Sequence, residues 1–504
     1  MGMTSCYHEF PGGGGGGGGG GGTSTAKVSL TLVSDTLPAN LGIVSFRVNI
    51  RSVVLTSSTG TQSTLNLGAL NNGNGLVVDL ARAQSDSIFL GTVSSVPTGT
   101  NSSMAVSFSG AELAFFNGTG AAITNMTPQC PANSICVANF TVSGTPVITA
   151  SQTISGNTGF GIDFNLANAI TVTGGTLSVN FTNSGTNNVI SSFALPRSGS
   201  NLAAGQLDLI EDFTGAVSLG GVGVTITSGT NAGRGSIAAA SSATTNYDQD
   251  PSGTLCPTGT GTLSGCVLSN EAASMDAILN SDGTFTVQEI EPQVASPITD
   301  RVEGTVVFVN SGNQSQFGII VNDIIPAGSN SKVGTINIGD PLTVNLANVV
   351  GTGFLVDTKG LAVSGFTGNF AGATTTGALH LGQSVAVHVT GFTAASGNNP
   401  ASVTSDLATL RFSRFIAVVN AASGGSAEFS INTLPGYFGF TPTSIFDVQT
   451  FAGTQGGDGI TNSDGVTSAG ALVQARPVAI RALFIEDAGN TIDPAFSAAK
   501  IRQH

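Results

Sequence analysis

The sequence predicts an all-β protein in which an N-terminal β-sandwich is followed by about three tandem small β-barrels of OB-like fold. Apolar residues alternate with polar or small ones along segments such as 44–50 and 478–484, which is the period of a half-buried strand. Clusters of Asn, Gly and Pro, as in 71–75 and 397–400, separate these segments and are typical of turns. Helical spacing is scarce, and we expect at most one short helical turn, near 79–85.

Length and charge narrow the class of protein. The chain has 504 residues, which is enough for about three or four domains. Charged residues make up 9% of the chain and the formal net charge is −14, so the protein lacks the basic surface that phosphate backbones attract. We therefore expect no nucleic-acid partner. No apolar run reaches the roughly 18 residues that a membrane helix needs.

Residues 1–27 are predicted to be a lipid-anchored tether. Met3-Thr4-Ser5-Cys6 resembles the end of a bacterial lipoprotein signal, in which Cys6 would carry the lipid and attach the protein to a membrane. The glycine run 12–22 would follow it as a flexible coil. Only five residues precede Cys6, whereas a signal needs a basic start and an apolar stretch, so this interpretation requires a start upstream of Met1. The alternative is an unstructured tail with an incidental thiol.

The other four cysteines form two close pairs, Cys130 with Cys136 and Cys256 with Cys266. Each pair lies in a segment rich in Pro, Gly, Ser or Asn, where a short disulfide loop closes easily. We predict two disulfides and hence an oxidising, extracytoplasmic compartment. Free buried thiols and a zinc site are the alternatives, and zinc fits less well because neither pair has a neighbouring His.

Domain boundaries follow from composition and from internal similarity. The segments 211–217, 301–306 and 415–419 align as unit starts, and 275–291, 385–414 and 478–502 correspond as unit ends, each a strand, a turn and a strand. Similarity at this scale indicates duplicated domains. We expect a tether over 1–27, a sandwich over 28–196, a linker over 197–205 and barrel units over 206–295, 296–414 and 415–504.

Several sequence motifs resemble known families. Val44-Ser45-Phe46-Arg47-Val48-Asn49-Ile50, the segment 78–92 and Val96-Pro97-Thr98-Gly99-Thr100 resemble the bacterial domain of unknown function numbered four-three-eight-two, over about 28–116. Members of that family usually have a Tyr where Asn101 stands here. The later units are similar to another uncharacterised family of small barrels, through strands such as Gly382-Gln383-Ser384-Val385-Ala386-Val387. The resemblance implies an exported, often lipid-anchored bacterial protein with no assigned activity.

Catalytic residues are hard to find in this sequence. A nucleophile needs a base, usually His, and the chain has only His8, His380, His388 and His504. We interpret His380 and His388 as solvated surface residues, with His388 on the polar side of its strand, and a role as ligand or base is the alternative. No Gly-x-Ser-x-Gly, Walker or His-Glu-x-x-His motif occurs. Paired carboxylates such as Glu289 and Glu291 leave glycoside hydrolysis as a third-ranked hypothesis, and we predict that the protein is not an enzyme.

Calcium is the one cofactor for which the sequence offers a weak candidate. Asp248-Gln249-Asp250-Pro251-Ser252-Gly253 follows the opening of a calcium loop, although position twelve is Gly259 and not the usual Glu. Asp248 and Asp250 are therefore candidate ligands, and Asp458 with Asp464 form a second, weaker pair. Acidic turn residues without a metal are the alternative in both places, and we expect no other cofactor.

Binding of sugars is the final class considered. Stacking platforms are generally built from Trp and Tyr, but the chain has no Trp and three Tyr, against 28 Phe that we assign to the core. Phe412 and Phe415 with Arg411 and Arg414 form a basic-aromatic cluster, interpreted as a strand end in preference to a binding patch. We therefore predict a non-catalytic, exported cell-envelope protein with a structural or adhesive role and a protein or glycan partner at the surface. A carbohydrate- or small-ligand-binding module is the alternative.

Overall fold

The protein is described here from a computed structural model. It describes residues 24–35, 37–38, 40–142, 147–148, 152–184, 188–195, 206–220, 223–227, 236–240, 246–247, 272–292, 300–325, 331–347, 349, 353–358, 361, 363, 370–397, 399–422, 427–451, 461–485 and 495–503. Strands dominate this part of the chain, so the predicted all-β class is confirmed. No helix in these ranges is long and apolar enough to cross a membrane.

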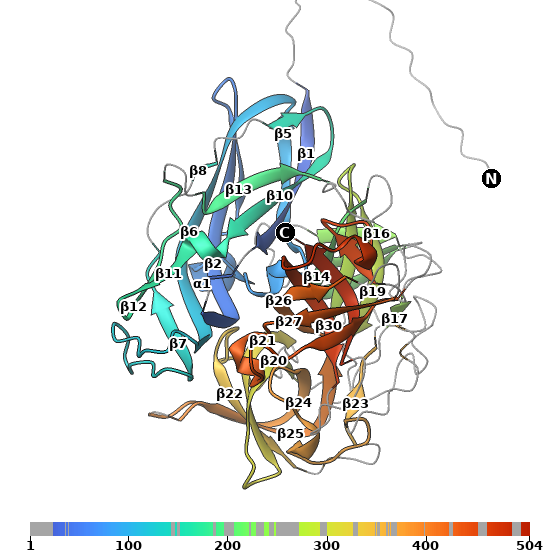
Figure 1. The fold of residues 1–504 in the computed structure, drawn as a ribbon. Coiled ribbons are helices and arrows are strands. Elements are labelled where there is room, and N and C mark those ends of the chain that lie inside the picture. Colours follow the sequence, from blue (N-terminus) through green and yellow to red (C-terminus); the bar gives the residue numbers. More distant parts are fainter. Residues whose placement is uncertain are drawn as a thin grey trace, which may run out of the picture.

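The N-terminal domain is a sandwich of two sheets (Figure 1). The smaller sheet has the order β13-β10-β1-β5, with β1 Thr25–Asp35, β5 Ile88–Pro97, β10 Thr158–Asn165 and β13 Ile190–Ala194. The larger has the order β3-β2-β6-β7, with β2 Leu41–Ser57, β3 Gln62–Asn66, β6 Gly99–Asn117 and β7 Ile135–Phe140. β4 (Leu76–Asp79) pairs with β2, and β8 (Val147–Ile148) and β9 (Gln152–Ile154) pair with β6.

The core of the sandwich follows from the predicted alternation. Phe46, Val48 and Ile50 on β2 are fully buried between the sheets, and the ring of Phe108 stacks on Phe181 with the centroids 4.7 Å apart. Short elements complete the domain: α1 Leu70–Gly73, α2 Leu166–Ala169, the hairpin β11 Ile170–Thr173 with β12 Thr176–Val179, and the 3₁₀ turn η1 Arg82–Gln84. The helical turn expected near 79–85 is therefore η1.

Three sheets follow in sequence. The first contains β14 Gln206–Gly220, β15 Gly223–Thr227, β16 Ser236–Ala240, β17 Asn246–Tyr247, β18 Ala272–Asn280 and β19 Phe285–Pro292. The second contains β20 Arg301–Val309, β21 Gln316–Ile325, β22 Pro341–Leu346, β23 Leu355–Val356, β24 Ser384–Thr393 and β25 Ala401–Arg411, and the 3₁₀ turn η3 Thr376–Ala378 lies between β23 and β24. The third contains β26 Ser413–Ala421, β27 Glu428–Asn432, β28 Phe446–Gln449, β29 Asn462–Asp464, β30 Pro477–Phe484 and β31 Phe496–Gln503. The 3₁₀ turns η4 Gly436–Phe438 and η5 Ala469–Ala471 lie between its strands.

These three sheets share one connectivity. Each runs third-second-first-fourth-fifth among its main strands, with a short extra strand (β17, β23 or β29) beside the fifth. A parallel pairing of the third main strand with the fifth, as between β22 and β25, links the two ends. The second and third units are thereby closed five-stranded barrels, and the pairing order is that of an OB-fold. The segments that aligned in the sequence are the first strand and the last hairpin of each unit.

The sandwich and the barrels pack against one another (Figure 1). The core of the third barrel is continuous with the sandwich, because Val44 and Ala114 of the sandwich belong to the same buried cluster as Phe415 and Phe438. The core of the second barrel is centred on residues such as Phe317 and Val385 and also includes Leu483 and Ile485 of the third unit. The C-terminal strand ends in the middle of the molecule, where the sandwich meets the barrels (Figure 1).

Candidate functional site

The segment 79–87 lies at the junction between the sandwich and the barrels. It begins at the end of β4, where Asp79 Oδ1 accepts hydrogen bonds from the backbone N–H of Phe46 at 2.8 Å and of Ala81 at 2.9 Å. These bonds fix the turn that leads into η1. Residues 83–87 are buried, so a polar loop of the sandwich is enclosed by its neighbours.

Asp86 and Glu303 organise an ion-pair network at this junction. Arg414 Nε donates to Asp86 Oδ2 at 2.7 Å, and a second guanidinium, from Arg481, lies 3.7 Å from Asp86 Oδ1. Glu303 Oε1 lies 3.6 Å from Arg414 Nη1 and 4.0 Å from Arg82 Nη2. The network joins the sandwich loop to the first strands of the second and third barrels. Buried ion pairs are costly to break from one side, because the remaining charge is left without compensation.

Arg502 has the most enclosed charge in this network. Its side chain is fully buried, and its Nε donates to Asp464 Oδ2 at 2.7 Å. The remaining guanidinium N–H groups donate to the carbonyl oxygens of Ala83, Gln84 and Asp86 at 3.2, 3.3 and 3.1 Å and to Ser87 Oγ at 3.3 Å. The last strand of the chain is thereby bonded to the polar loop of the sandwich.

The predicted basic-aromatic cluster belongs to this junction. β25 ends at Arg411 and β26 begins at Ser413, so the preferred interpretation as a strand end is confirmed. Phe412 is 1% exposed and stacks under the guanidinium of Arg481, whose Cζ lies 5.3 Å from the ring centroid. Arg411 pairs with Asp357 and lies 3.9 Å from Glu303 Oε2. A surface binding patch at this cluster is therefore wrong, because its aromatic rings are buried.

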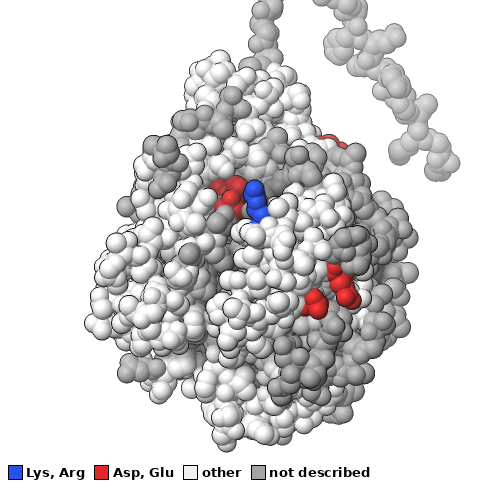
Figure 2. Space-filling view, viewed as in Figure 1, with Lys and Arg blue, Asp and Glu red and all other residues white. Residues whose placement is uncertain are grey.

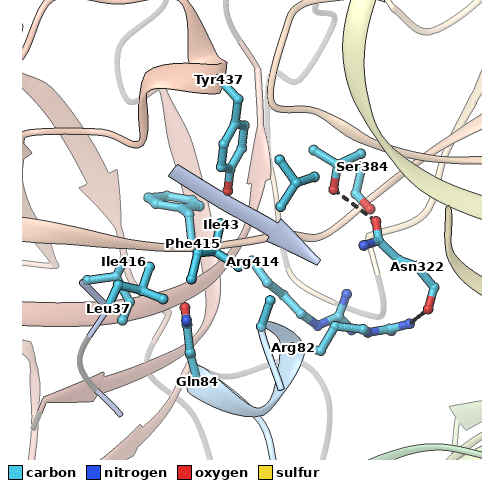
Figure 3. A pocket seen from close by; sticks show the side chains of 13 residues that line it. Leu37, Ile43, Arg82, Gln84, Asn322, Ser384, Arg414, Phe415, Ile416 and Tyr437 are labelled. Carbon is cyan, nitrogen blue, oxygen red and sulfur yellow. Dashed lines mark hydrogen bonds between the residues drawn. The ribbon is translucent and has the colours of Figure 1, made fainter. Parts of the chain in front are cut away.

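A small polar cavity lies beside the network (Figure 3). Figure 3 shows side chains converging on it from the sandwich and from the second and third barrels: Leu37, Ile43, Arg82, Gln84, Asn322, Ser384, Arg414, Phe415, Ile416 and Tyr437. Its volume is about 10 Å³, which is the size of one water molecule. Burial raises the pKa of the Tyr437 phenol, and the Asp79 carboxylate raises it further. The cavity is too small for a substrate.

A larger, open cleft lies on the other side of the same loop. Its volume is about 340 Å³, within the range of small-ligand sites. It is lined by Leu70, Asn71, Gly75, Leu76, Val77, Val78, Asp79, Arg82, Asp86, Ser87, Ile88, Asn322, Asp323 and Ile338. Burial raises the pKa of Asp79 against the opposing effect of its two backbone hydrogen bonds. The cleft therefore has apolar and polar lining residues, with the Asp79 carboxyl group buried beneath its wall.

Glu112 is a further buried carboxyl group near this cleft. Its Oε2 lies 3.1 Å from Arg47 Nη2. Burial raises the pKa of Glu112, Arg47 lowers it, and the negative charge of Asp340 in the second barrel raises it. A Cβ placed on Gly339 would lie 2.7 Å from Glu112 Oε1, so glycine permits the close approach of the second barrel to the sandwich.

The structure describes only some of the cysteines and acidic residues predicted to form disulfides or bind calcium. Cys130 and Cys136 form a disulfide with their Cα atoms 5.8 Å apart. Cys6, Cys256 and Cys266 lie outside the described residues, as do Asp248, Asp250 and Asp458. Asp464 is 1% exposed and pairs with Arg502, so its carboxylate serves an ion pair. Within the described ranges no group of three or more His, Cys, Asp or Glu side chains is placed to hold a metal ion.

The two internal histidines lie at the surface of the second barrel. His388 Nδ1 is 2.6 Å from Asp406 Oδ1, and both side chains are about a quarter exposed, at 25% and 26%. This agrees with the predicted polar face of the strand. His380 is half-buried, with its ring centroid 6.3 Å from that of Phe484. Glu289 and Glu291 both lie on β19, so their segment is a strand, as the glycoside hydrolase hypothesis assumed.

Comparison with known proteins gives no further guide. No family model, no curated protein and no solved structure matches this chain.

The ion-pair network is the part of the site that sequence reasoning missed. Its members are Arg82, Asp86, Glu303, Asp357, Arg411, Arg414, Asp464, Arg481 and Arg502. A signal was present, because Arg481 interrupts the apolar run of 478–484 and Arg502 follows Ile501. A charge within an apolar strand of a chain with so few charges indicates a buried pair.

Proposed function

We propose that the protein is a non-catalytic, exported cell-envelope protein with a structural or adhesive role. The distribution of charge carries this proposal. Among the described side chains, those that are charged and exposed are Lys27, Arg51, Asp282, Lys332, Glu428 and Arg476. Those that are charged and buried are more numerous: Asp79, Asp86, Glu112, Asp300, Arg301, Asp357, Arg411, Asp464, Arg481, Lys500 and Arg502.

This distribution reverses the usual one, in which charges cover the surface. The face seen in Figure 2 is largely uncharged, with Lys, Arg, Asp and Glu in a few small groups. Several of the buried charges, such as Asp86, Arg481 and Arg502, bond one domain to another, and few charged side chains are exposed among the described residues. A multidomain body whose described exposed surface carries few charged side chains suits display and contact at a cell surface, where binding to the highly charged polymers of the cell would be a disadvantage.

Two features of the sequence support the cell-envelope address. The Met3-Thr4-Ser5-Cys6 motif and glycine run suit a lipid anchor with a tether, and the resemblance of 28–116 to an exported bacterial family suits the same address. The Cys130–Cys136 disulfide suits an oxidising compartment.

The test is to express the gene from its own locus, including the upstream codons, and to fractionate the cells. The mass of the mature N-terminal peptide is then measured for the wild type and for Cys6→Ser. We expect a diacylglyceryl-modified Cys6 in the envelope fraction, and loss of the modification in the variant. An unmodified Met1 in the cytosol would overturn the proposed address.

Binding of a small ligand is the second candidate function, and the 340 Å³ cleft favours it. The cleft has apolar side chains such as Leu76 and Ile88 beside polar ones such as Arg82 and Asn322. Such a site would take a small molecule with an apolar part and one or two hydrogen-bonding groups. Leu76→Trp would fill the cleft and abolish ligand-induced thermal stabilisation in a screen of neutral metabolites. A screen without any stabilising compound would remove this candidate.

A further inference from the structure

The outer surface of the second barrel carries a row of uncharged side chains on three adjacent strands. We call this set the amide face: Phe308, Asn310, Gln316, Gly318, Thr343 and Asn345. Phe308 pairs with Gly318, Gly318 with Thr343, and Gln316 with Asn345. Because residues two apart in a strand share one side of the sheet, all six lie on the same side. Phe317 and Val344, which alternate with them, are buried in the barrel core.

Phe308 is the exposed aromatic ring of this face. It is 54% exposed, and Ile445 and Val473 are the other large hydrophobic side chains that are exposed in the described part of the chain. A register shift between Val306 and Phe308 turns Phe308 outward. A Cβ placed on Gly318 would lie 3.4 Å from Phe308 Cβ and 3.8 Å from Cδ1. The absence of a side chain at Gly318 thus leaves room for the ring beside the sheet.

Hydrogen bonds orient the amide groups next to the ring. Asn310 Nδ2 donates to Gln316 Oε1 at 2.9 Å, and Gln316 Nε2 donates to Asn345 Oδ1 at 3.0 Å. Asn310 Oδ1 accepts from the backbone N–H of Gly312 and of Asn313. Each amide has further donor or acceptor capacity beyond these bonds. The three amides are therefore fixed in orientation and half-exposed to solvent, and little entropy is lost when a ligand binds them.

The chemistry of this face selects a class of ligand. Sugar rings stack their C–H faces on aromatic rings and exchange hydrogen bonds with side-chain amides through their hydroxyl groups. Neighbouring strands are about 4.8 Å apart, so the three amides span roughly 10 Å, a length of more than one sugar unit. The six positions include no Lys or Arg, which disfavours a phosphate or sulfate group. In OB-folds the strands and loops at this part of the barrel bind oligosaccharides and oligonucleotides, and here the neutral surface favours the sugar.

We propose that the amide face binds a neutral oligosaccharide chain. Phe308 forms the stacking platform, and Asn310, Gln316 and Asn345 bond the hydroxyl groups beside it. This inference rests on the proposed adhesive role, because it names the ligand and the surface through which contact is made. It uses none of the junction residues, whose side chains hold the domains together.

The test is binding of the purified protein to an array of neutral oligosaccharides (glucans, mannans, galactans and chitin fragments) and acidic ones (uronic acid-containing and sulfated). The array is followed by calorimetric titration with the neutral oligosaccharide that binds best. We expect Phe308→Ala to weaken binding about tenfold, which corresponds to about 1.4 kcal/mol, because the stacking platform is lost. Gln316→Ala weakens it by a smaller factor, and Phe308→Trp retains it.

Ile445→Ala is the matched control, because Ile445 is 55% exposed on the third barrel. This variant should bind as the wild type does. Equal melting temperatures of Phe308→Ala and wild type exclude unfolding as the cause of any loss. The proposal is overturned by an array without signal, by binding of acidic glycans alone, or by equal affinity of Phe308→Ala and wild type.

The failure of this inference is separable from that of the proposed function. Cells that carry the protein at their surface and adhere equally well with Phe308→Ala would exclude the amide face and leave the adhesive role in place. A protein found in the cytosol that binds neutral glycans through Phe308 would exclude the cell-envelope role and leave the amide face in place.

Discussion

The second and third barrels have the same strand order and closure but different surroundings. The third barrel is built into the molecule: a Cβ on Gly436 would lie 2.4 Å from the Phe116 ring of the sandwich, and Tyr437 and Phe438 join one buried cluster with Val44 and Ala114. The core cluster of the second barrel includes residues of the third barrel but none of the sandwich, and this barrel presents Phe308 to solvent. The same strand connectivity therefore attaches the third barrel to the sandwich and, in the second barrel, presents the surface around Phe308 to solvent.

The difference extends to single matched positions. In the second barrel Phe308 pairs with Gly318, whereas the third barrel has Ala421 opposite Ser430 at the corresponding place, after the same kind of register shift. Ala421 is exposed but has no ring, so the third barrel presents no aromatic side chain there. Duplication of a stable β-barrel leaves each copy able to change its outer residues, because the pairing and core specify the fold.

Loss of Arg502 should have the largest effect on the junction that holds the third barrel. Arg502→Met leaves Asp464 and three carbonyl oxygens of the sandwich loop without their donor. Breaking a buried ion pair from one side costs about 3–5 kcal/mol, and we expect a loss of this order in urea denaturation. Arg476→Met, at an exposed arginine of the same barrel, is the control and should change stability little. Equal stabilities of the two variants would contradict the role given to the network.

Crowding the contact of the third barrel should have an intermediate effect. Gly436→Ala brings a methyl group against Phe116, and overpacking of this kind costs about 1–3 kcal/mol. Gly334→Ala in the second barrel is the matched control, since a Cβ there has no atom within 4 Å. Thermal unfolding of both variants measures the difference. A Gly334→Ala variant that is destabilised as much as Gly436→Ala would mean that the contact with Phe116 is not the cause of the loss.

Asp79 should contribute the smallest effect, and that effect should depend on pH. Burial raises its pKa above the ordinary value of 3.8, so the folded state retains the proton longer and stability falls as the pH rises from about that value through the folded pKa. Asp79→Asn keeps the oxygen that accepts the two backbone hydrogen bonds and removes the charge. The melting temperature of the variant relative to wild type should therefore be higher at pH 7 than at pH 3. A relative melting temperature that stays constant or falls between these pH values would contradict the raised pKa.

The sequence predicts the fold better than the site, for physical reasons. Alternation along 44–50 and 478–484 reports which side of a strand is buried, and the repeated hairpins mark each barrel. Ion pairs such as Asp86 with Arg414 join residues 328 positions apart, and no local pattern encodes such a partner. Phe308 shows the same limit, because its exposure depends on a register shift and on a glycine in the next strand. The assignment of all Phe to the core is wrong at this residue.

The central claim is that the buried charges make the sandwich and the third barrel one cooperative unit. Since the chain has no Trp, Phe193→Trp in the sandwich and Phe440→Trp in the third barrel supply separate fluorescence probes at half-buried sites. Urea unfolding is followed with each probe, alone and combined with Arg502→Met. We predict coincident transitions without Arg502→Met and separate transitions with it. Transitions that are already separate with Arg502 in place would contradict the claim.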